Sequence, residues 1–210
     1  FLWIATWDGL NRYDGYEFRV YVNDASNASS ISDNFVSALY EDSDGFIWIG
    51  TVNGYLNRFN KKTEAFKRYF VNDFFSGTKS SESDFYDYPL AFSRNQINTV
   101  TSITEDKDGY LWIGTWGNGL IKFDRKEGNG IHFNNDTNNP QSLSSNRVID
   151  IISDRNNDLW IATFGGGLNK LVSDNINGSD QSKIQSTDFL RYRSNEINKF
   201  SLSDDKTISL

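Results

Sequence analysis

The stretch Trp48-Ile49-Gly50-Thr51 recurs three more times in this chain of 210 residues, and two of the copies carry Ala in place of Gly. The other copies occupy residues 3–6, 112–115 and 160–163. A glycine and a short apolar stretch follow each copy, as in Gly54-Tyr55-Leu56-Asn57-Arg58-Phe59. Such a repeat decides the architecture, because each unit then packs against similar copies of itself.

A second shared stretch precedes the last three copies and begins with the pattern Asn-x-Val. It covers residues 34–42, 98–106 and 146–154. In the first of these units the turn Asp42-Ser43-Asp44-Gly45 follows, and Asp-Gly supplies the positive φ that a tight hairpin needs. Each unit therefore predicts short strands a, b and c, and a fourth strand d such as residues 66–70 completes it.

The Trp-Ile-Gly-Thr strand b carries apolar or small residues on both of its faces. This pattern indicates burial on both sides, as in a sheet packed between two other sheets. Four strands over roughly 45 residues, stacked sheet on sheet, are typical of a β-propeller blade. The sequence thus predicts an all-β chain with about four blades' worth of four-stranded antiparallel sheets, as a fragment of a larger propeller.

The repeats divide the chain into units. We expect strands b to d of a first blade at 1–25, a second blade at 30–72, an inserted loop at 73–95, a third blade at 96–135 and a fourth at 142–195. Residues 201–210 predict either the first strand of a further blade or a closing strand for the first. The second possibility would close a four-bladed ring. Because the sequence starts and stops inside a repeat, we expect instead a fragment of a larger propeller.

Composition excludes several classes of function. Lys+Arg number 21 against 28 Asp+Glu, and the net charge of −7 argues against a nucleic-acid binder. No run approaches the roughly 18 apolar residues of a membrane span, so we expect no membrane contact by this segment. The chain has no Cys and a single His, His132, so we expect no disulfide, no thiolate nucleophile, no His-cluster metal site and no cofactor.

Residues 93–124 follow much of a known repeat, with Glu105-Asp106-Lys107-Asp108-Gly109 leading into Trp112-Ile113-Gly114-Thr115. The chain resembles the two-component regulator propeller family over nearly its whole length. The resemblance implies the periplasmic sensor region of a Bacteroidetes hybrid two-component system, which detects breakdown products of complex glycans. It also implies that the kinase activity lies in other parts of the parent receptor, whose remaining blades would be partners of this chain. A homodimer stays open.

The Asp-x-Asp-Gly turns at 42–45 and 106–109 resemble the start of a calcium loop. An EF-hand-type loop needs further ligands and a distal Glu, whereas here an apolar strand follows directly. Turn chemistry is therefore favoured over a metal site. No pair of acids is predicted to converge on one site, so no residue is assigned a catalytic role.

Blade geometry predicts a ligand face instead. In an antiparallel blade the b–c and d–a connections emerge on the same face, and these loops combine aromatic and amide side chains. Aromatic planes beside amides suit a sugar, whose apolar face stacks while its hydroxyls form hydrogen bonds. The candidate ligand-binding residues are Trp7, Asn53, Trp116, Asn118, Phe164, Tyr86 and Tyr88. The alternative is that the rings of Trp7, Trp116 and Phe164 only pack between blades.

Two other classes of function compete with a non-catalytic glycan sensor. A structural or protein-interaction propeller would serve as a spacer and dimerisation surface, and it would bind no small molecule. A lyase or glycosidase propeller would require converging acids or a metal. Fold alone does not decide among these three.

Overall fold

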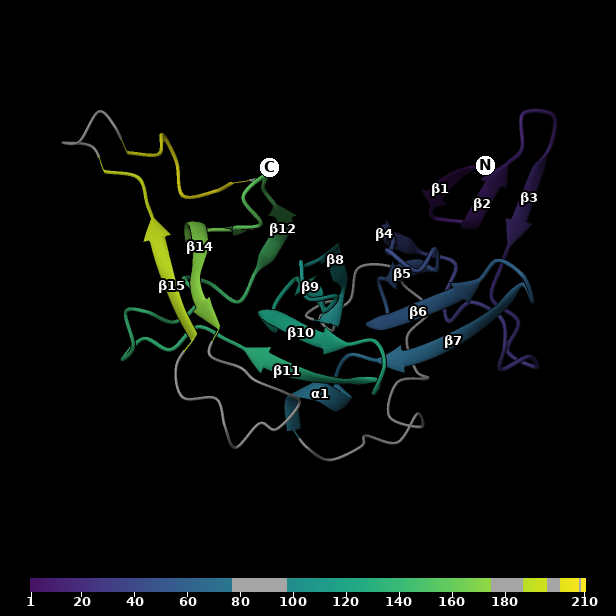
Figure 1. The fold of residues 1–210 in the computed structure, drawn as a ribbon, viewed down its shortest axis with the longest axis horizontal. Coiled ribbons are helices and arrows are strands. Elements are labelled where there is room, and N and C mark those ends of the chain that lie inside the picture. Colours follow the sequence, from purple (N-terminus) through teal and green to yellow (C-terminus); the bar gives the residue numbers. More distant parts are fainter. Residues whose placement is uncertain (77–97, 175–186, 196–200, 208) are drawn as a thin grey trace. The chain divides into compact units, whose positions relative to one another are not determined.

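The computed structural model describes residues 1–76, 98–174, 187–195, 201–207 and 209–210 (Figure 1). The chain divides into two compact units, Phe1–Val100 and Thr101–Leu210. The described residues contain 15 strands in four antiparallel sheets, together with one four-residue helical turn. The predicted all-β architecture of propeller-type sheets is therefore confirmed.

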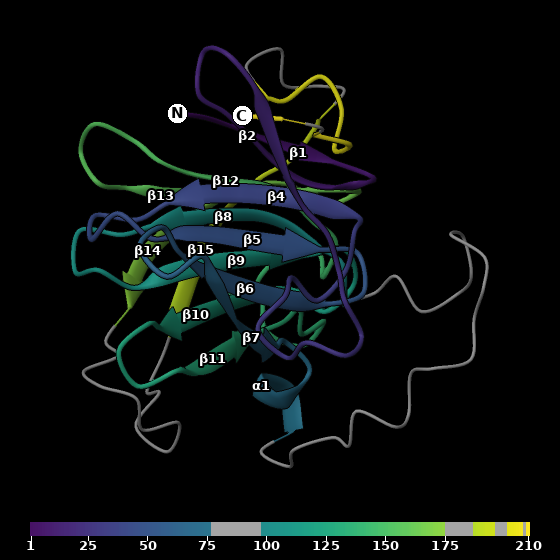
Figure 2. The ribbon, with the colours of Figure 1, turned by 90° about the vertical axis from the view of Figure 1, so that its right-hand side faces the viewer.

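The first unit contains two of the sheets, and each is a meander in chain order. One sheet has three strands, β1 (Leu2–Thr6), β2 (Gly9–Tyr13) and β3 (Phe18–Tyr21). The other has four, β4 (Val36–Glu41), β5 (Ile47–Thr51), β6 (Tyr55–Asn60) and β7 (Ala65–Phe70), which Figure 2 shows side by side. The helical turn α1 (Asp73–Ser76) follows β7. It occupies the start of the segment expected as an inserted loop at 73–95, and residues 77–95 of that segment lie outside the described residues.

The repeated Trp-Ile-Gly-Thr stretch of this unit is β5, and all five residues of the strand are buried. This agrees with the two-sided burial that its sequence predicts. One apolar cluster packs between the two sheets and is closed at its edge by the half-buried rings of Trp3 and Tyr21. Its buried members are Leu10, Ile31, Val36, Ile47, Ile49, Phe59 and Phe66.

The second unit repeats the arrangement with two four-stranded meanders. The first comprises β8 (Val100–Glu105, starting at the unit boundary), β9 (Leu111–Thr115), β10 (Leu120–Asp124) and β11 (Asn129–Phe133). The second comprises β12 (Val148–Ser153), β13 (Leu159–Thr163), β14 (Gly167–Asp174) and β15 (Thr187–Tyr192). A buried cluster around Trp112, Leu120, Val148 and Ile161 joins these two sheets.

The a–b turns owe their shape to one carboxylate each. Asp106 accepts hydrogen bonds from the backbone N–H groups of Asp108 (3.0 Å) and Tyr110 (2.9 Å), and from the Trp112 indole N–H (2.8 Å). The turns that begin at Asp42 and Asp154 repeat this pattern. The carboxylate six residues before each Trp thus anchors strand b to its turn, which supports the turn interpretation of the Asp-x-Asp-Gly motif.

The third of these turns lacks the glycine that the other two carry at positive φ. Gly45 and Gly109 have φ values of 82° and 85°, and Asn157 takes the corresponding place with φ of 62°. Asn tolerates the left-handed region better than most residues with a side chain. The departure from Asp-Gly in this repeat therefore leaves the turn intact.

The Asp154 turn predicts a specific acid sensitivity. The indole N–H of Trp160, followed by backbone N–H groups, holds the pKa of the Asp154 carboxyl below its ordinary value of 3.8. The resulting stabilisation is complete above pH 3.8 and is lost as the pH falls below that value through the folded-state pKa. We expect Asp154→Asn to reduce the pH dependence of the unfolding free energy below pH 4, measured by urea titration of Trp fluorescence.

The variant Trp160→Phe provides the matched control, because it removes the donor and keeps the carboxyl group. It should reduce the same pH dependence. An unchanged slope in both variants would contradict the assignment of this linkage to the Asp154–Trp160 hydrogen bond.

A second repeated device ties the segment before strand a to the rest of its sheet. In the last sheet the buried Asn169 side chain accepts a hydrogen bond from the Ser144 N–H (2.9 Å) and donates to the Ser144 hydroxyl (2.8 Å) and the Ile161 carbonyl (3.3 Å). Arg191 on the outer strand donates to the carbonyl and hydroxyl of Ser142, each over 2.8 Å. Asn57, Arg68, Ser30 and Ser32 form the same set of contacts in the β4–β7 sheet.

Among the described residues, the β8–β11 sheet does not form this set of contacts. Ile121 and His132 pair in register on β10 and β11, at the positions that Asn169 and Arg191 hold on β14 and β15. The Ser-Leu-Ser stretch is also missing before Asn98 in the sequence. Ser, Asn and Arg therefore occur together in two sheets, and Ile and His take the places of Asn and Arg in this one. The three-stranded sheet has Asn11 opposite Val20 and thus carries the asparagine without the arginine.

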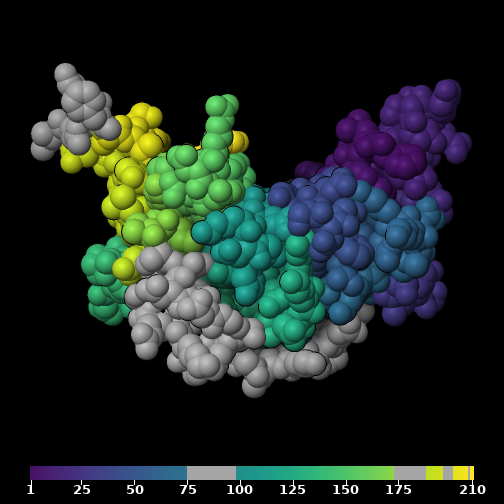
Figure 3. All heavy atoms as spheres, in the orientation of Figure 1, coloured from purple at the N-terminus to yellow at the C-terminus, as the bar shows by residue number. Residues whose placement is uncertain are grey.

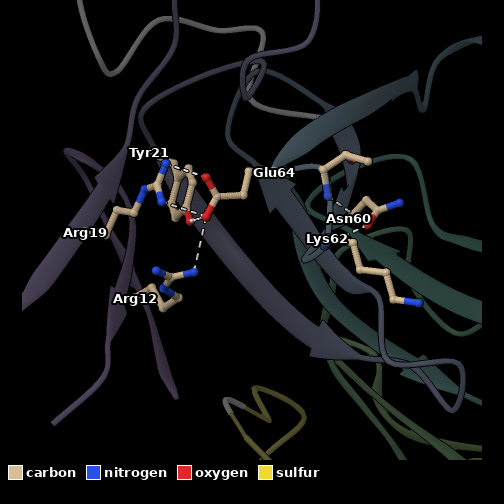
Figure 4. A network of polar contacts seen from close by, with 7 residues as sticks. Arg12, Arg19, Tyr21, Asn60, Lys62 and Glu64 are labelled. Atoms are coloured by element: carbon tan, nitrogen blue, oxygen red, sulfur yellow. Dashed lines mark hydrogen bonds and ion pairs between the residues drawn. The ribbon is translucent and has the colours of Figure 1, made fainter.

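Within the first unit, Glu64 joins the β6–β7 turn to the three-stranded sheet (Figure 4). Its carboxylate accepts hydrogen bonds from Arg12 (3.3 Å), Arg19 (2.7 Å) and the Tyr21 hydroxyl (3.2 Å). Burial, and then the Glu64 charge, raise the pKa of Tyr21 above its ordinary value, so the phenol stays protonated and donates. The cluster holds the two sheets of this unit together at the end where the c–d turns lie.

Residues 201–207 lie against the last sheet of the second unit, where Figure 3 shows them in yellow. The Asp205 carbonyl accepts hydrogen bonds from Gly165 N–H (3.1 Å) and Gly167 N–H (2.9 Å), and Lys206 forms an antiparallel bridge with Phe164. Equivalent hydrogen bonds occur earlier in the chain, where the Asn34 carbonyl accepts from the Gly9 N–H and the Asn146 carbonyl accepts from the Gly119 N–H. Whether the segment starts a further blade or closes the first stays a prediction.

Candidate functional site

Each b–c loop is held by the threonine that ends strand b. The hydroxyl groups of Thr6, Thr115 and Thr163 donate to the carbonyls of Gly9 (2.7 Å), Gly119 (2.9 Å) and Gly167 (2.9 Å). Those glycines have φ between 76° and 112°. The Thr and the Gly of the repeat therefore fold a tight loop, and the residue after the Thr begins it.

In the first unit this loop residue is Trp7, whose side chain is 74% exposed. Its ring meets that of Phe35 edge-on, with the centroids 6.3 Å apart and the planes at 65°. Asn53, in the next b–c loop, is exposed, and its side chain accepts from the Thr51 hydroxyl (2.7 Å) and donates to the Ser32 carbonyl (3.4 Å). Trp7 is therefore an open aromatic surface, whereas Asn53 also braces its own loop.

Asp33 is a further acid near this loop that the motif search missed. Its carboxylate accepts from the Phe35 N–H (3.2 Å) and contacts the backbone N–H of Asn53. Burial raises the pKa of the Asp33 carboxyl above its ordinary value. The signal in the sequence is weak, because Asp33 stands in a Ser-rich connection and is replaced by Ser145 in the last repeat.

In the second unit, Trp116 and Phe164 come from successive b–c loops and lie together. Their ring centroids are 5.9 Å apart with the planes tilted by 45°, and Trp116 is still 36% exposed. The guanidinium of Arg147 lies 6.0 Å from the centroid of the Phe164 ring. The contact between the two rings fits both a ligand surface and packing between blades, so their role stays a prediction. The candidate residues did not include Arg147, which stands at the start of strand a.

Asn118 and His132 lie beside the Trp116 loop. The Asn118 N–H donates to the Thr115 hydroxyl (3.0 Å), and its carbonyl contacts the His132 ring. Burial is the main effect on His132 and lowers the pKa of its ring below the ordinary value of 6.5, which favours a neutral imidazole at neutral pH. His132 stands on β11, the outer strand of its sheet.

The remaining candidates, Tyr86 and Tyr88, lie outside the described residues. Among the described residues no group of three or more His, Cys, Asp or Glu side chains could hold a metal ion. The same residues contain no helix that is long and apolar enough to cross a membrane. A cavity of about 220 Å³ opens in the second unit beside the a–b turns at 106–108 and 156–158, at the opposite end of the strands from the b–c loops.

Comparison with known proteins agrees with this architecture of propeller blades. Residues 30–53, 96–117 and 142–165 match the two-component regulator propeller family. The chain therefore contains two-component regulator propeller repeats, as its motifs predicted.

Individual relatives extend this picture. A histidine kinase of Formosa agariphila is 32% identical over 103 residues, which are 49% of this chain and 6% of that protein. The extracellular domain of a putative hybrid two-component system from B. thetaiotaomicron is similar with a TM-score of 0.62 and 26% identity, over 90% of this chain and 23% of that one. This chain thus spans a small part of either relative.

Virginiamycin B lyase from Staphylococcus aureus is also similar in structure. Its TM-score is 0.57 and its identity is 17%, over 92% of this chain and 52% of the lyase. At this level of identity the similarity shows the fold alone, because one propeller architecture supports unrelated functions.

Proposed function

We propose that this chain is part of the extracytoplasmic, periplasmic sensor region of a hybrid two-component receptor. In this role it is non-catalytic, and the kinase that it controls belongs to other parts of the parent protein. The main support for this proposal is the match of three segments of the chain to the two-component regulator propeller family. The similarity to the extracellular domain of a putative hybrid two-component system supports the same role.

The ligand in this proposal is a glycan-derived oligosaccharide, bound at the b–c loops. Trp7 and Trp116 offer exposed aromatic surface, and Asn53 and Asn118 place polar groups in the same class of loop. A sugar ring stacks through its C–H groups on such a surface, while loop amides and carbonyls bind its hydroxyls. The Trp116–Phe164 contact gives part of this surface a packing role as well.

A thermal-shift screen of the 210-residue chain against neutral and acidic oligosaccharides tests the proposal. We expect one class to raise the melting temperature, and substitution of the loop tryptophan that the ligand contacts, tested separately as Trp7→Ala and Trp116→Ala, to abolish that rise. Tyr16→Ala is the matched control, because Tyr16 is 96% exposed but lies in the β2–β3 hairpin at the opposite end of the strands. No shift from a folded sample across the panel would contradict direct sensing by these loops.

The structure also offers an observation in favour of a second function, an interaction propeller that acts as spacer and dimerisation surface. Phe18, Val20 and Val22 on and beside the outer strand β3 are 60%, 51% and 48% exposed. An apolar row on an outer strand is suited to contact with another protein. Light scattering on the same samples separates the two, because a dimer that ignores every oligosaccharide would favour the interaction role.

A further inference from the structure

Two cations, Arg147 before β12 and Lys206 in the 201–207 segment, lie beside the b–c loop that begins at Phe164, in a chain whose net charge is −7. The Arg147 guanidinium lies 6.0 Å from the Phe164 ring centroid, and the Arg147 carbonyl accepts the Phe164 N–H over 2.9 Å. Lys206 approaches Phe164 from the other side through an antiparallel bridge. Side chains of residues paired across strands in this way project to the same face.

Both cations are exposed, and neither forms an ion pair with an acid in the described part of the chain. The acids nearest to Lys206 in sequence are Asp204 and Asp205. Asp204 accepts a hydrogen bond from the backbone N–H of Lys206 (2.9 Å), and Asp205 accepts one from the backbone N–H of Ser194 (2.5 Å). Asp150, on β12, accepts the Leu210 N–H over 3.0 Å. Each of these carboxylates bonds to a backbone donor, and among the described residues none of them forms an ion pair with Arg147 or Lys206.

We propose that Arg147, with Lys206, makes the Trp116–Phe164 surface a subsite for an anionic sugar, and specifically for the carboxylate of a uronic acid residue. This inference rests on the proposed glycan-sensing function and names the class of glycan. A uronate presents an apolar ring face and a planar carboxylate. The exposed indole of Trp116 stacks with the ring, and Arg147 binds the carboxylate through two parallel N–H donors.

The chemistry favours a carboxylate over other anions for a geometric reason. A guanidinium presents two parallel N–H donors that match the two coplanar oxygens of a carboxylate, and the Arg147 guanidinium carbon lies 6.0 Å from the Phe164 ring centroid. The ammonium group of Lys206 supplies a second positive charge and does not require a particular orientation of the anion. A sulfate ester shares the negative charge, and it is distinguished from a uronate by experiment.

Isothermal titration of the full 210-residue chain with uronate oligosaccharides and with their methyl esters tests the proposal. The ester keeps the ring and linkage and removes only the charge. We expect the acid form to bind at least about tenfold more tightly than the ester, because a charge-assisted bidentate contact is lost. Arg147→Gln should weaken the acid by a similar factor and leave the ester unchanged, while Arg147→Lys should fall between.

Arg155→Gln is the matched control, since Arg155 is an exposed arginine in the a–b turn of the same sheet. It should leave binding of the acid form unchanged. Equal binding of acid and ester, or tighter binding of a sulfated neutral sugar than of the uronate, would overturn this inference and leave glycan sensing intact. An absence of binding by any acidic, sulfated or neutral oligosaccharide would overturn the proposed function together with it.

Discussion

Replacing Asn169 with leucine is expected to lower the free energy of unfolding by about 2–4 kcal/mol, because two buried backbone groups lose their partners. The Ser144 N–H and the Ile161 carbonyl both bond to the Asn169 side chain, which is 0% exposed. Leucine has the same branched arrangement of four side-chain heavy atoms and is larger than asparagine, so the loss does not come from a cavity. Chemical denaturation followed by Trp fluorescence measures the change.

Ile121→Leu is the matched control, because Ile121 holds the same register position in the β8–β11 sheet without a serine partner. We expect a cost below about 1.5 kcal/mol, as for other volume-conserving apolar exchanges. A loss in Asn169→Leu no larger than in this control would show that the Ser–Asn contact does not stabilise the sheet.

The repeated sequence motifs made the sheets predictable, because strand b and the turn before it depend on residues that are close together in the sequence. Trp48-Ile49-Gly50-Thr51 is a strand buried on both faces, and its preceding Asp-x-Asp-Gly is a turn, as expected. The partner of the first aspartate was not predicted. A carboxylate six residues before an indole has no defined geometry until the hairpin has formed.

Contacts between segments far apart in sequence were the part that local reasoning missed. Arg191 lies 49 residues from Ser142, and nothing in either neighbourhood indicates that they meet. Arg147 was missed for the same reason, because its place beside Phe164 follows from the register of strands a and b. The aromatic loop residues were predictable, since the repeat aligns Trp7, Trp116 and Phe164 at one position after the threonine.

The glycine of the Trp-Ile-Gly-Thr stretch allows neighbouring sheets to pack closely against each other, because it has no side chain. The substitution Gly114→Ala tests this. A Cβ on Gly114 would lie 2.6 Å from Val148 Cγ1 and 2.9 Å from the Thr101 hydroxyl, which is closer than such atoms can approach. Val148 is fully buried in the apolar cluster that joins the two sheets, so a shift of its side chain would disturb the packing of that cluster. We expect the substitution to lower the unfolding free energy by about 1–3 kcal/mol, as overpacked cores do.

The same position in the last repeat is Ala162, which is also fully buried, so a methyl group there is compatible with the fold. If the clash with Val148 causes the loss at Gly114, removing the γ carbons of Val148 should relieve it. We therefore expect the cost of Gly114→Ala plus Val148→Ala to be smaller than the sum of the two single costs, by at least about 0.5 kcal/mol. If the costs of the two substitutions simply add, the clash with Val148 is not the cause. The loss of unfolding free energy in Gly114→Ala would then come from the backbone of β9.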